Sequence, residues 1–215
     1  MKTSVKITPI PALNDNYIWL MDNGTEAVCI DPGEAAPVLD FLRENRLNLQ
    51  QIWITHHHGD HTAGIVALKQ AFPECRVYGN HDIAGRTDDA GAGQILPFPA
   101  HGKAADAVFS DGTAEVWHTP GHTDTHLAYL FRHNGQTHVF CGDTLFSAGC
   151  GRVFTGTMEQ LYQSLKNFSE LPDDTLFYPA HEYTAPNLCF AAAVEPNNPD
   201  IQTALQAAEN TPTLP

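Results

Sequence analysis

Five side chains of metal-binding type, four of them candidate ligands, stand close together in one short segment of this chain. The segment runs from Thr55 to His61 and reads Thr-His-His-His-Gly-Asp-His. Its candidate ligands are His56, His58, Asp60 and His61. Imidazole nitrogen and carboxylate oxygen are the ligands that borderline ions such as zinc prefer. A bend of this kind does not let all of them face a single ion comfortably, so the spacing favours two ions a few Å apart, as in two-metal hydrolases.

Three later segments place another residue of metal-ligand type after a predicted strand. The three residues are His122, Asp143 and His181. Proline and glycine immediately before His122 force a turn that can aim its side chain inward. In layered α/β proteins, loops that follow strands are where sites are assembled. We therefore expect these residues to join the first cluster.

The pattern of apolar residues predicts the elements that must position this cluster. Strands are predicted at residues 17–21, 27–30, 51–54, 76–78, near 95, 107–109, 114–117, 127–131, 137–141 and 175–178. Helices are predicted at residues 34–46, 62–72, 157–168, 185–193 and 200–210, with a capping box at Thr157 and Gln160. Hairpin turns are predicted at Asn23-Gly24, Asp111-Gly112 and Asn134-Gly135. Two β-rich halves, each accompanied by helices, indicate two packed sheets with helices outside.

Composition and charge exclude several classes of protein. The chain has 215 residues, 42% of them hydrophobic, and a formal net charge of −14, which is typical of an acidic globular protein. The acidic balance argues against nucleic acid or an anionic membrane as the main partner. The five cysteines form no CxxC pair, and neither a secretory signal nor a membrane-spanning stretch is visible. We expect a cytoplasmic protein, soluble and monomeric.

Four motifs in order carry a family resemblance. His-x-His-x-Asp-His, followed by Gly-His-Thr, Gly-Asp-Thr and Ala-His-Glu, resembles the metallo-β-lactamase superfamily. The longer strings Thr119-Pro-Gly-His-Thr, Gly142-Asp-Thr-Leu-Phe-Ser-Ala-Gly-Cys-Gly-Arg152 and His181-Glu-Tyr-Thr184 resemble its glyoxalase II branch, the hydroxyacylglutathione hydrolases. The resemblance implies an α/β fold, a four-layer αββα sandwich over residues 1–181. A C-terminal helical segment over residues 182–215, shorter than in the family, is expected to follow.

The resemblance also implies which residues bind each of two metal ions. The first metal ion would be bound by His56, His58 and His122, and the second by Asp60, His61 and His181, with Asp143 bridging the two. Asp31 would orient the metal-binding loop from behind the ligands. Zinc is the expected ion, and iron and manganese accept the same nitrogen and oxygen ligands.

The implied reaction is hydrolysis of S-(2-hydroxyacyl)glutathione, such as S-D-lactoylglutathione, to glutathione and a 2-hydroxy acid such as D-lactate, a step of methylglyoxal detoxification. Two cations would lower the pKa of a shared water, and Asp60 would orient the resulting hydroxide for attack on the thioester. A thiolate leaves readily, so no dedicated general acid is required. The substrate-binding residues implied are Arg152, Phe154, Tyr183 and Asn187, of which Phe154 stands where some relatives carry tyrosine.

Other interpretations remain open on the sequence alone. An iron-dependent persulfide dioxygenase shares the fold but keeps only part of this ligand set. A lactonase, a β-lactamase or another thioesterase is possible within the same superfamily, and a non-enzymatic metal-binding protein is a third class. Among the remaining candidates, His57 is expected to point away from the metals. His126 is expected to make a structural hydrogen bond, and Cys150 to pack in its loop.

Overall fold

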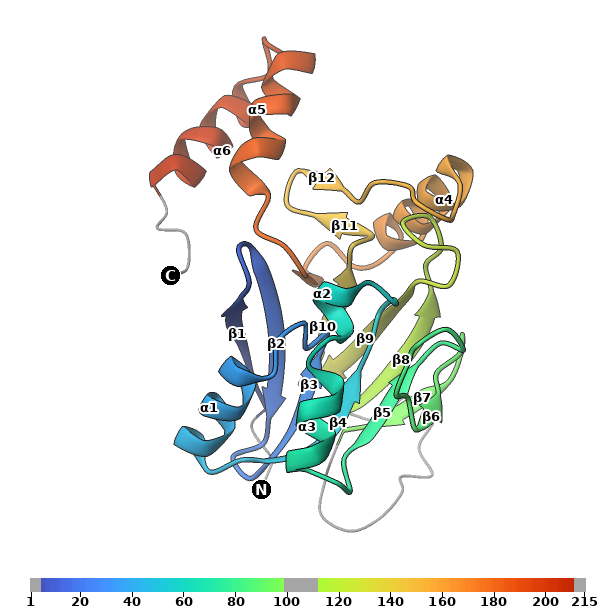
Figure 1. The fold of residues 1–215 in the computed structure, drawn as a ribbon. Helices are drawn as coiled ribbons and strands as arrows, with labels where there is room; N and C mark the ends of the chain where they lie inside the picture. Colours follow the sequence, from blue (N-terminus) through green and yellow to red (C-terminus); the bar gives the residue numbers. More distant parts are fainter. Residues whose placement is uncertain (1–4, 99–111, 211–215) are drawn as a thin grey trace.

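Two β-sheets face each other in the computed structural model of this chain, which describes residues 5–98 and 112–210 (Figure 1). The first sheet has the order β1-β2-β3-β4-β5-β6. Its strands are β1 (Lys6–Ala12), β2 (Asn16–Asp22), β3 (Glu26–Ile30), β4 (Asn48–Trp53), β5 (Arg76–Gly79) and β6 (Asp88–Asp89). The second sheet has the order β13-β10-β9-β8-β7. Its strands are β7 (Ile95–Pro97), β8 (Thr113–His118), β9 (Leu127–His133), β10 (Gln136–Gly142) and β13 (Leu176–Pro179). A small hairpin pairs β11 (Leu145–Phe146) with β12 (Gly149–Cys150).

Strand β9 explains why the fold has four layers. Its apolar run is continuous, and side chains alternate between the two faces of a strand. Tyr129 and Phe131 face the first sheet, whereas Ala128 and Leu130 face the opposite side and pack with Phe168 of helix α4 (Met158–Ser169). On the far side of the first sheet, helices α1 (Ala36–Asn45) and α3 (Ile65–Ala71) supply a third apolar cluster. The predicted αββα sandwich is confirmed.

The predicted helix over residues 62–72 is divided in the structure. A short helix α2 (Gly59–Thr62) precedes α3, and the two are separated at Gly64. The Gly64 amide donates to the carbonyl oxygen of Pro32 at 2.8 Å, and a Cβ at this position would lie 2.5 Å from that same oxygen. The close approach of another segment therefore interrupts the helix. As a result, Asp60 and His61 lie on a helical turn instead of in an open loop.

Strand β1 is absent from the sequence-based expectations because it contains Pro9 and Pro11. Proline cannot donate to a sheet ladder and is confined to positions such as edge strands. Strand β1 lies at the edge of the first sheet and pairs antiparallel with β2. The hairpin at Asn134-Gly135 is confirmed, since both residues have positive φ between β9 and β10. The strand predicted at residues 107–109 and the first residue of the turn at Asp111-Gly112 lie outside the described residues.

The C-terminal helices stand beside the sandwich. Helix α5 (Thr184–Val194) follows β13 and contacts β12, and α6 (Pro199–Asn210) folds back against α5 (Figure 1). Both were predicted, as was α4 with its capping box, in which the Thr157 side chain accepts from the Gln160 amide. The division of the chain at residue 181 stays a prediction. In the described part of the chain, every helix is too short or too polar to cross a membrane.

Candidate metal centre

The predicted ligands come from four segments, each of which follows the C-terminal end of a strand. These strands are β4 in the first sheet and β8, β10 and β13 in the second. Folding brings the four segments to one end of the sandwich, so residues far apart in the sequence share one volume. Most of the ligand side chains are buried, among them His56, His61, His122, Asp143 and His181.

The first group consists of three histidines whose ring nitrogens converge. His56 Nε2 lies 2.9 Å from His58 Nδ1, and His122 Nε2 lies 3.1 Å from the same nitrogen. These atoms can all face one ion. The structure therefore brings together the three residues predicted for the first metal.

The second group consists of Asp60, His61 and His181. The Oδ2 atom of Asp60 lies 3.5 Å from His61 Nε2 and 3.4 Å from His181 Nε2. Asp143 stands between the groups, because its Oδ2 lies 3.4 Å from His122 Nε2 and its Oδ1 lies 3.4 Å from His181 Nε2. All seven predicted ligands thus meet, with Asp143 where a bridging ligand would lie.

Two buried atoms in this cluster indicate that a cation fits between them. Within residues 5–98 and 112–210, His61 Nε2 and Asp143 Oδ1 have no hydrogen-bond partner, and they lie 3.5 Å apart. Leaving a buried polar atom unpaired costs about 1–3 kcal/mol. A divalent cation bound by both atoms would remove that cost. The donor set of imidazole nitrogens and carboxylate oxygens fits such an ion.

The electrostatics keep the two carboxylates ionised, as metal ligands must be. The rings of His181 and His61, 3.4 and 3.5 Å away, hold the pKa of Asp60 well below its usual range. Burial alone would raise the pKa of Asp143, but the neighbouring His61 and His181 outweigh it and lower this pKa to about 2. Both side chains are therefore negative at neutral pH.

Asp31, predicted to orient the metal-binding loop, lies directly behind His61. Its Oδ2 atom is 3.1 Å from His61 Nδ1. Its carboxylate also accepts from the Thr55 amide and from the Thr55 hydroxyl, at 2.7 Å each. Asp31 has the left-handed backbone conformation, with φ of 52°, which costs of order 1–3 kcal/mol for a non-glycine residue.

The sequence predicted a structural hydrogen bond for His126, and in the structure its hydrogen bonds support the cluster. It is fully buried, and burial lowers its pKa to about 3, so the ring is neutral. Its Nε2 accepts from the Asp143 amide at 3.2 Å, and its Nδ1 lies 3.0 Å from the Thr119 hydroxyl. His126 therefore fixes the loop that carries Asp143. His57, by contrast, is exposed, contacts Asp82 at 2.8 Å and belongs to neither ligand group.

Two further contacts were missed by sequence reasoning. Asp15 Oδ1 lies 2.8 Å from His181 Nδ1, and the Asn16 side chain donates to Asp60 Oδ2 at 3.2 Å. These contacts span 166 and 44 positions of the chain. No local spacing pattern links residues so far apart, and neither residue type is unusual before a strand.

A pocket of about 470 Å³ opens over both groups and contains the predicted substrate-binding residues. These are Arg152, Phe154, Tyr183 and Asn187. Phe154 meets the rings of His58 and His122 edge to face, with centroids 5.1 Å apart in both cases. Tyr183 stacks on His181 with centroids 4.9 Å apart. Phe146 also lines the pocket and meets His181 edge to face, so aromatic residues wall the pocket beside both groups.

Two other residues of this pocket have more limited roles. The Asn187 side chain donates to the Ser147 carbonyl at 3.1 Å, which ties α5 to the β11–β12 hairpin. Cys150 also lines the pocket, and burial raises the pKa of its thiol. A raised pKa makes a thiol a poorer nucleophile at neutral pH. Cys150 is exposed in the β11–β12 hairpin, so the packing role expected for it stays a prediction.

Comparison with known proteins places the chain in a family. The profile of the metallo-beta-lactamase superfamily matches residues 13–181. The chain belongs to this superfamily. Hydroxyacylglutathione hydrolase of Neisseria meningitidis serogroup A is 57% identical over 211 residues, which are 98% of this chain and 80% of that protein. Its counterpart in Haemophilus ducreyi is 46% identical over 216 residues, 98% of this chain and 86% of that protein. The predicted branch of the superfamily is confirmed.

A solved structure supports the assignment to the superfamily. The crystal structure of ETHE1 from Myxococcus xanthus superposes with a TM-score of 0.67 at 28% identity, covering 98% of this chain and 92% of that one. The sandwich and its helical layers are therefore those of the metallo-beta-lactamase fold.

Proposed function

We propose that this protein is a binuclear metal-dependent hydrolase of glutathione thioesters. Its reaction would convert S-D-lactoylglutathione and water to glutathione and D-lactate. The observation that carries the proposal is the placement of Asp143, whose two carboxylate oxygens face different ligand groups at 3.4 Å. The substrate class is supported by relatives named hydroxyacylglutathione hydrolase, at 57% and 46% identity.

The proposed roles follow from the position of each residue. The first ion would be held by His56, His58 and His122, the second by Asp60, His61 and His181, and both by Asp143. When bound, two divalent cations supply Lewis-acid chemistry that makes water nucleophilic near neutral pH and stabilises negative charge on a carbonyl oxygen. Zinc is proposed because these nitrogen and oxygen ligands suit it, and iron and manganese accept them too.

The protein's own residues orient the reactants. Asp60 remains negative and would accept a hydrogen bond from the attacking water, which orients the lone pair of that water toward the thioester. Arg152 is proposed to bind a carboxylate of glutathione, because it is the guanidinium in the pocket. Tyr183, Phe154 and Asn187 would form the walls against which the peptide part lies. The departing thiolate needs no proton from the protein in order to leave.

The experiment is a steady-state assay of thiol release from S-D-lactoylglutathione, combined with elemental analysis of the same sample. We expect thioester hydrolysis that depends on about two metal ions per chain. A sample with full metal occupancy and no hydrolysis would rule the proposal out. Oxygen uptake with glutathione persulfide would instead favour the dioxygenase alternative, against which the complete second group argues. The cytoplasmic location and the monomeric state stay predictions.

Neighbouring histidines provide a matched control for this assay. His58→Gln removes a proposed ligand, whereas His57→Gln changes the adjacent side chain, which contacts Asp82. We expect the first variant to lose activity together with bound metal, and the second to keep both. Equal losses in the two variants would mean that the effect comes from the loop and not from the ligand.

A further inference from the structure

A short segment at the start of β2 is joined to the segment that carries His181. The Tyr17 amide donates to the Ala180 carbonyl at 2.7 Å, and the Glu182 amide donates to the Asp15 carbonyl at 2.9 Å. Asn16 and His181 therefore form an antiparallel bridge. The segment from Asp15 to Tyr17 belongs to the first sheet's side of the sandwich, whereas His181 follows β13 of the second sheet.

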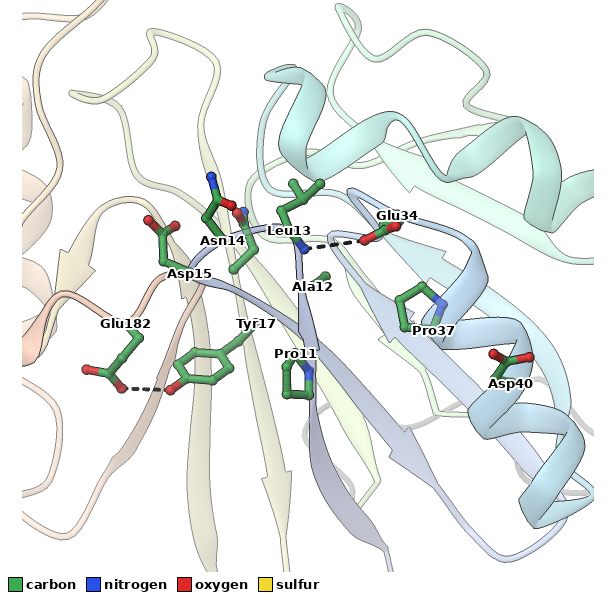
Figure 2. A pocket seen from close by; sticks show the side chains of 11 residues that line it. Pro11, Ala12, Leu13, Asn14, Asp15, Tyr17, Glu34, Pro37, Asp40 and Glu182 are labelled. Atoms are coloured by element: carbon green, nitrogen blue, oxygen red, sulfur yellow. Dashed lines mark hydrogen bonds between the residues drawn. The ribbon is translucent and has the colours of Figure 1, made fainter. Parts of the chain in front are cut away.

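Side chains reinforce this junction on the outer side of the cluster. The Tyr17 hydroxyl donates to Glu182 Oε2 at 2.7 Å. Figure 2 shows this hydrogen bond, with Asp15 beside it, at the wall of a second pocket of about 570 Å³. These hydrogen bonds fix the backbone around His181 without the help of an ion.

Asp15 determines which nitrogen of His181 faces the cluster. Its carboxylate lies 2.8 Å from Nδ1, so this nitrogen is the hydrogen-bond donor. The other nitrogen, Nε2, lies 3.4 Å from both Asp60 and Asp143 and is left to bind a cation. A carboxylate behind a histidine fixes the tautomer and ring orientation and raises the basicity of the ligand.

Asn16 acts on the neighbouring ligand. Its side chain is buried and donates to Asp60 Oδ2 at 3.2 Å and to the Asp60 carbonyl at 3.4 Å. Two consecutive residues therefore each contact a different ligand of the second group. The third ligand, His61, is contacted by Asp31.

We propose that Asp15 and Asn16 are positioning residues for the second metal ion, Asp15 by orienting His181 and Asn16 by orienting Asp60. This inference rests on the proposed function, because it presupposes a second ion. Asp15 sits behind its ligand and lines a pocket other than the substrate pocket, so its effect should appear in metal affinity before it appears in substrate binding.

The test is a titration of the metal-free full chain with Co²⁺, followed by visible absorption and by competition with a chelator. For Asp15→Asn we expect the first equivalent to bind as in the wild type and the second to bind about 10- to 100-fold more weakly, as is typical for loss of a partner behind a ligand. Asn16→Ala should weaken the second equivalent in the same direction. The thermal unfolding midpoint of the metal-free chain reports whether each variant folds.

Asp40→Asn is the matched control. Asp40 lines the same second pocket as Asp15 (Figure 2), is exposed and pairs with Arg43, so its removal changes the local charge equally. We expect Asp40→Asn to bind both equivalents normally. The proposal is overturned if Asp15→Asn keeps wild-type affinity for the second equivalent, if Asp40→Asn weakens it as much, or if Asp15→Asn weakens both equivalents alike. A wild-type chain that binds a single equivalent would contradict the proposed function itself.

Discussion

The two ligand groups of the metal centre are held by different kinds of partner. In the first group, His56 Nδ1 lies 3.0 Å from the Thr55 hydroxyl, and His122 Nδ1 donates to the Arg152 carbonyl at 2.7 Å. Both partners are neutral. The first group is therefore oriented by hydrogen bonds that add no net charge.

In the second group the partners of the histidines are carboxylates. Asp31 lies behind His61 at 3.1 Å, and Asp15 lies behind His181 at 2.8 Å. Asp143 is the largest cause that raises the pKa of both histidines. With Asp60 and Asp15 it outweighs burial and raises the pKa of His181 to about 10, and with Asp31 and Asp60 it raises that of His61 well above its ordinary value. Burial lowers the pKa of His56, His58 and His122. The histidines of the first group are therefore neutral at neutral pH, whereas those of the second group are basic and hold a proton that an ion must displace.

The largest expected effect comes from removing the residue that the two groups share. Asp143→Asn keeps the shape of the side chain but replaces one carboxylate oxygen with an amide nitrogen that cannot bind a cation. We expect kcat/KM to fall by about 10²- to 10³-fold, the size of losing one stabilising group in an active site. Metal content should fall as well. The exposed Asp89→Asn is the control, and a normal metal content with normal activity in Asp143→Asn would contradict a bridging role.

Asp31→Asn tests the charged support of the second group. We expect about 10- to 100-fold weaker binding of the second Co²⁺ equivalent and about 1–3 kcal/mol less stability in urea, because an amide cannot accept from both Thr55 donors. Asp22→Asn is a matched control, since Asp22 is also buried and accepts from the Gly24 amide at 3.0 Å. If Asp31→Asn changed stability alone, Asp31 would be a support of the loop and not of the ion.

The pKa difference between the groups predicts different pH dependence of metal binding. Because the pKa of His181 is raised to about 10 in the metal-free chain, this ring holds a proton at neutral pH that a cation must displace. The affinity of the second group should therefore rise by about tenfold per pH unit for each displaced proton, from about pH 6 to about pH 8. The lowered pKa values of the first group predict a flatter dependence. Co²⁺ titrations across this range measure the affinity of each equivalent. Equal slopes of affinity against pH for the two equivalents would contradict the predicted difference between the groups.

The smallest expected effect concerns the aromatic walls of the pocket. Tyr183→Phe keeps the ring that stacks on His181 and removes the hydroxyl. If that hydroxyl contacts the peptide part of glutathione, KM should rise by about 2- to 10-fold with kcat unchanged, the range of one hydrogen bond. Phe154→Tyr adds a hydroxyl on the other group and should lower KM by a similar or smaller factor. An effect of Tyr183→Phe on kcat alone would place the hydroxyl at the reacting atoms.

Local patterns were sufficient to predict much of the fold and to single out the seven residues that converge in the cluster. The β9–β10 hairpin depends on Asn134-Gly135, and α4 depends on its capping box, and both signals lie within a few residues. The ligands follow strand ends, so their convergence could be expected from topology. The break at Gly64 could not, because it depends on the carbonyl of Pro32, which only the folded chain brings near.

The partners of the ligands were predictable to different degrees. Asp31 was identified through the family resemblance, because it matches a family position that orients the metal-binding loop. Asp15 and Asn16 were not, because their contacts with His181 and Asp60 depend on how two sheets meet at an edge. Composition around them contains no metal-binding signal, so geometry was needed to assign them.

The bridge between Asn16 and His181 joins a segment that is synthesised early to one that is synthesised late. During synthesis the chain leaves the ribosome from its N-terminus, so Asp15 and Asn16 emerge early. Their partner segment at His181 emerges only after more than a hundred further residues. The three histidines of the first group are complete once His122 has emerged, and Asp143 follows soon after, whereas the second group requires His181. If the chain binds two ions as proposed, nascent chains should acquire them in sequence, the second after the last strand of the sandwich has been translated.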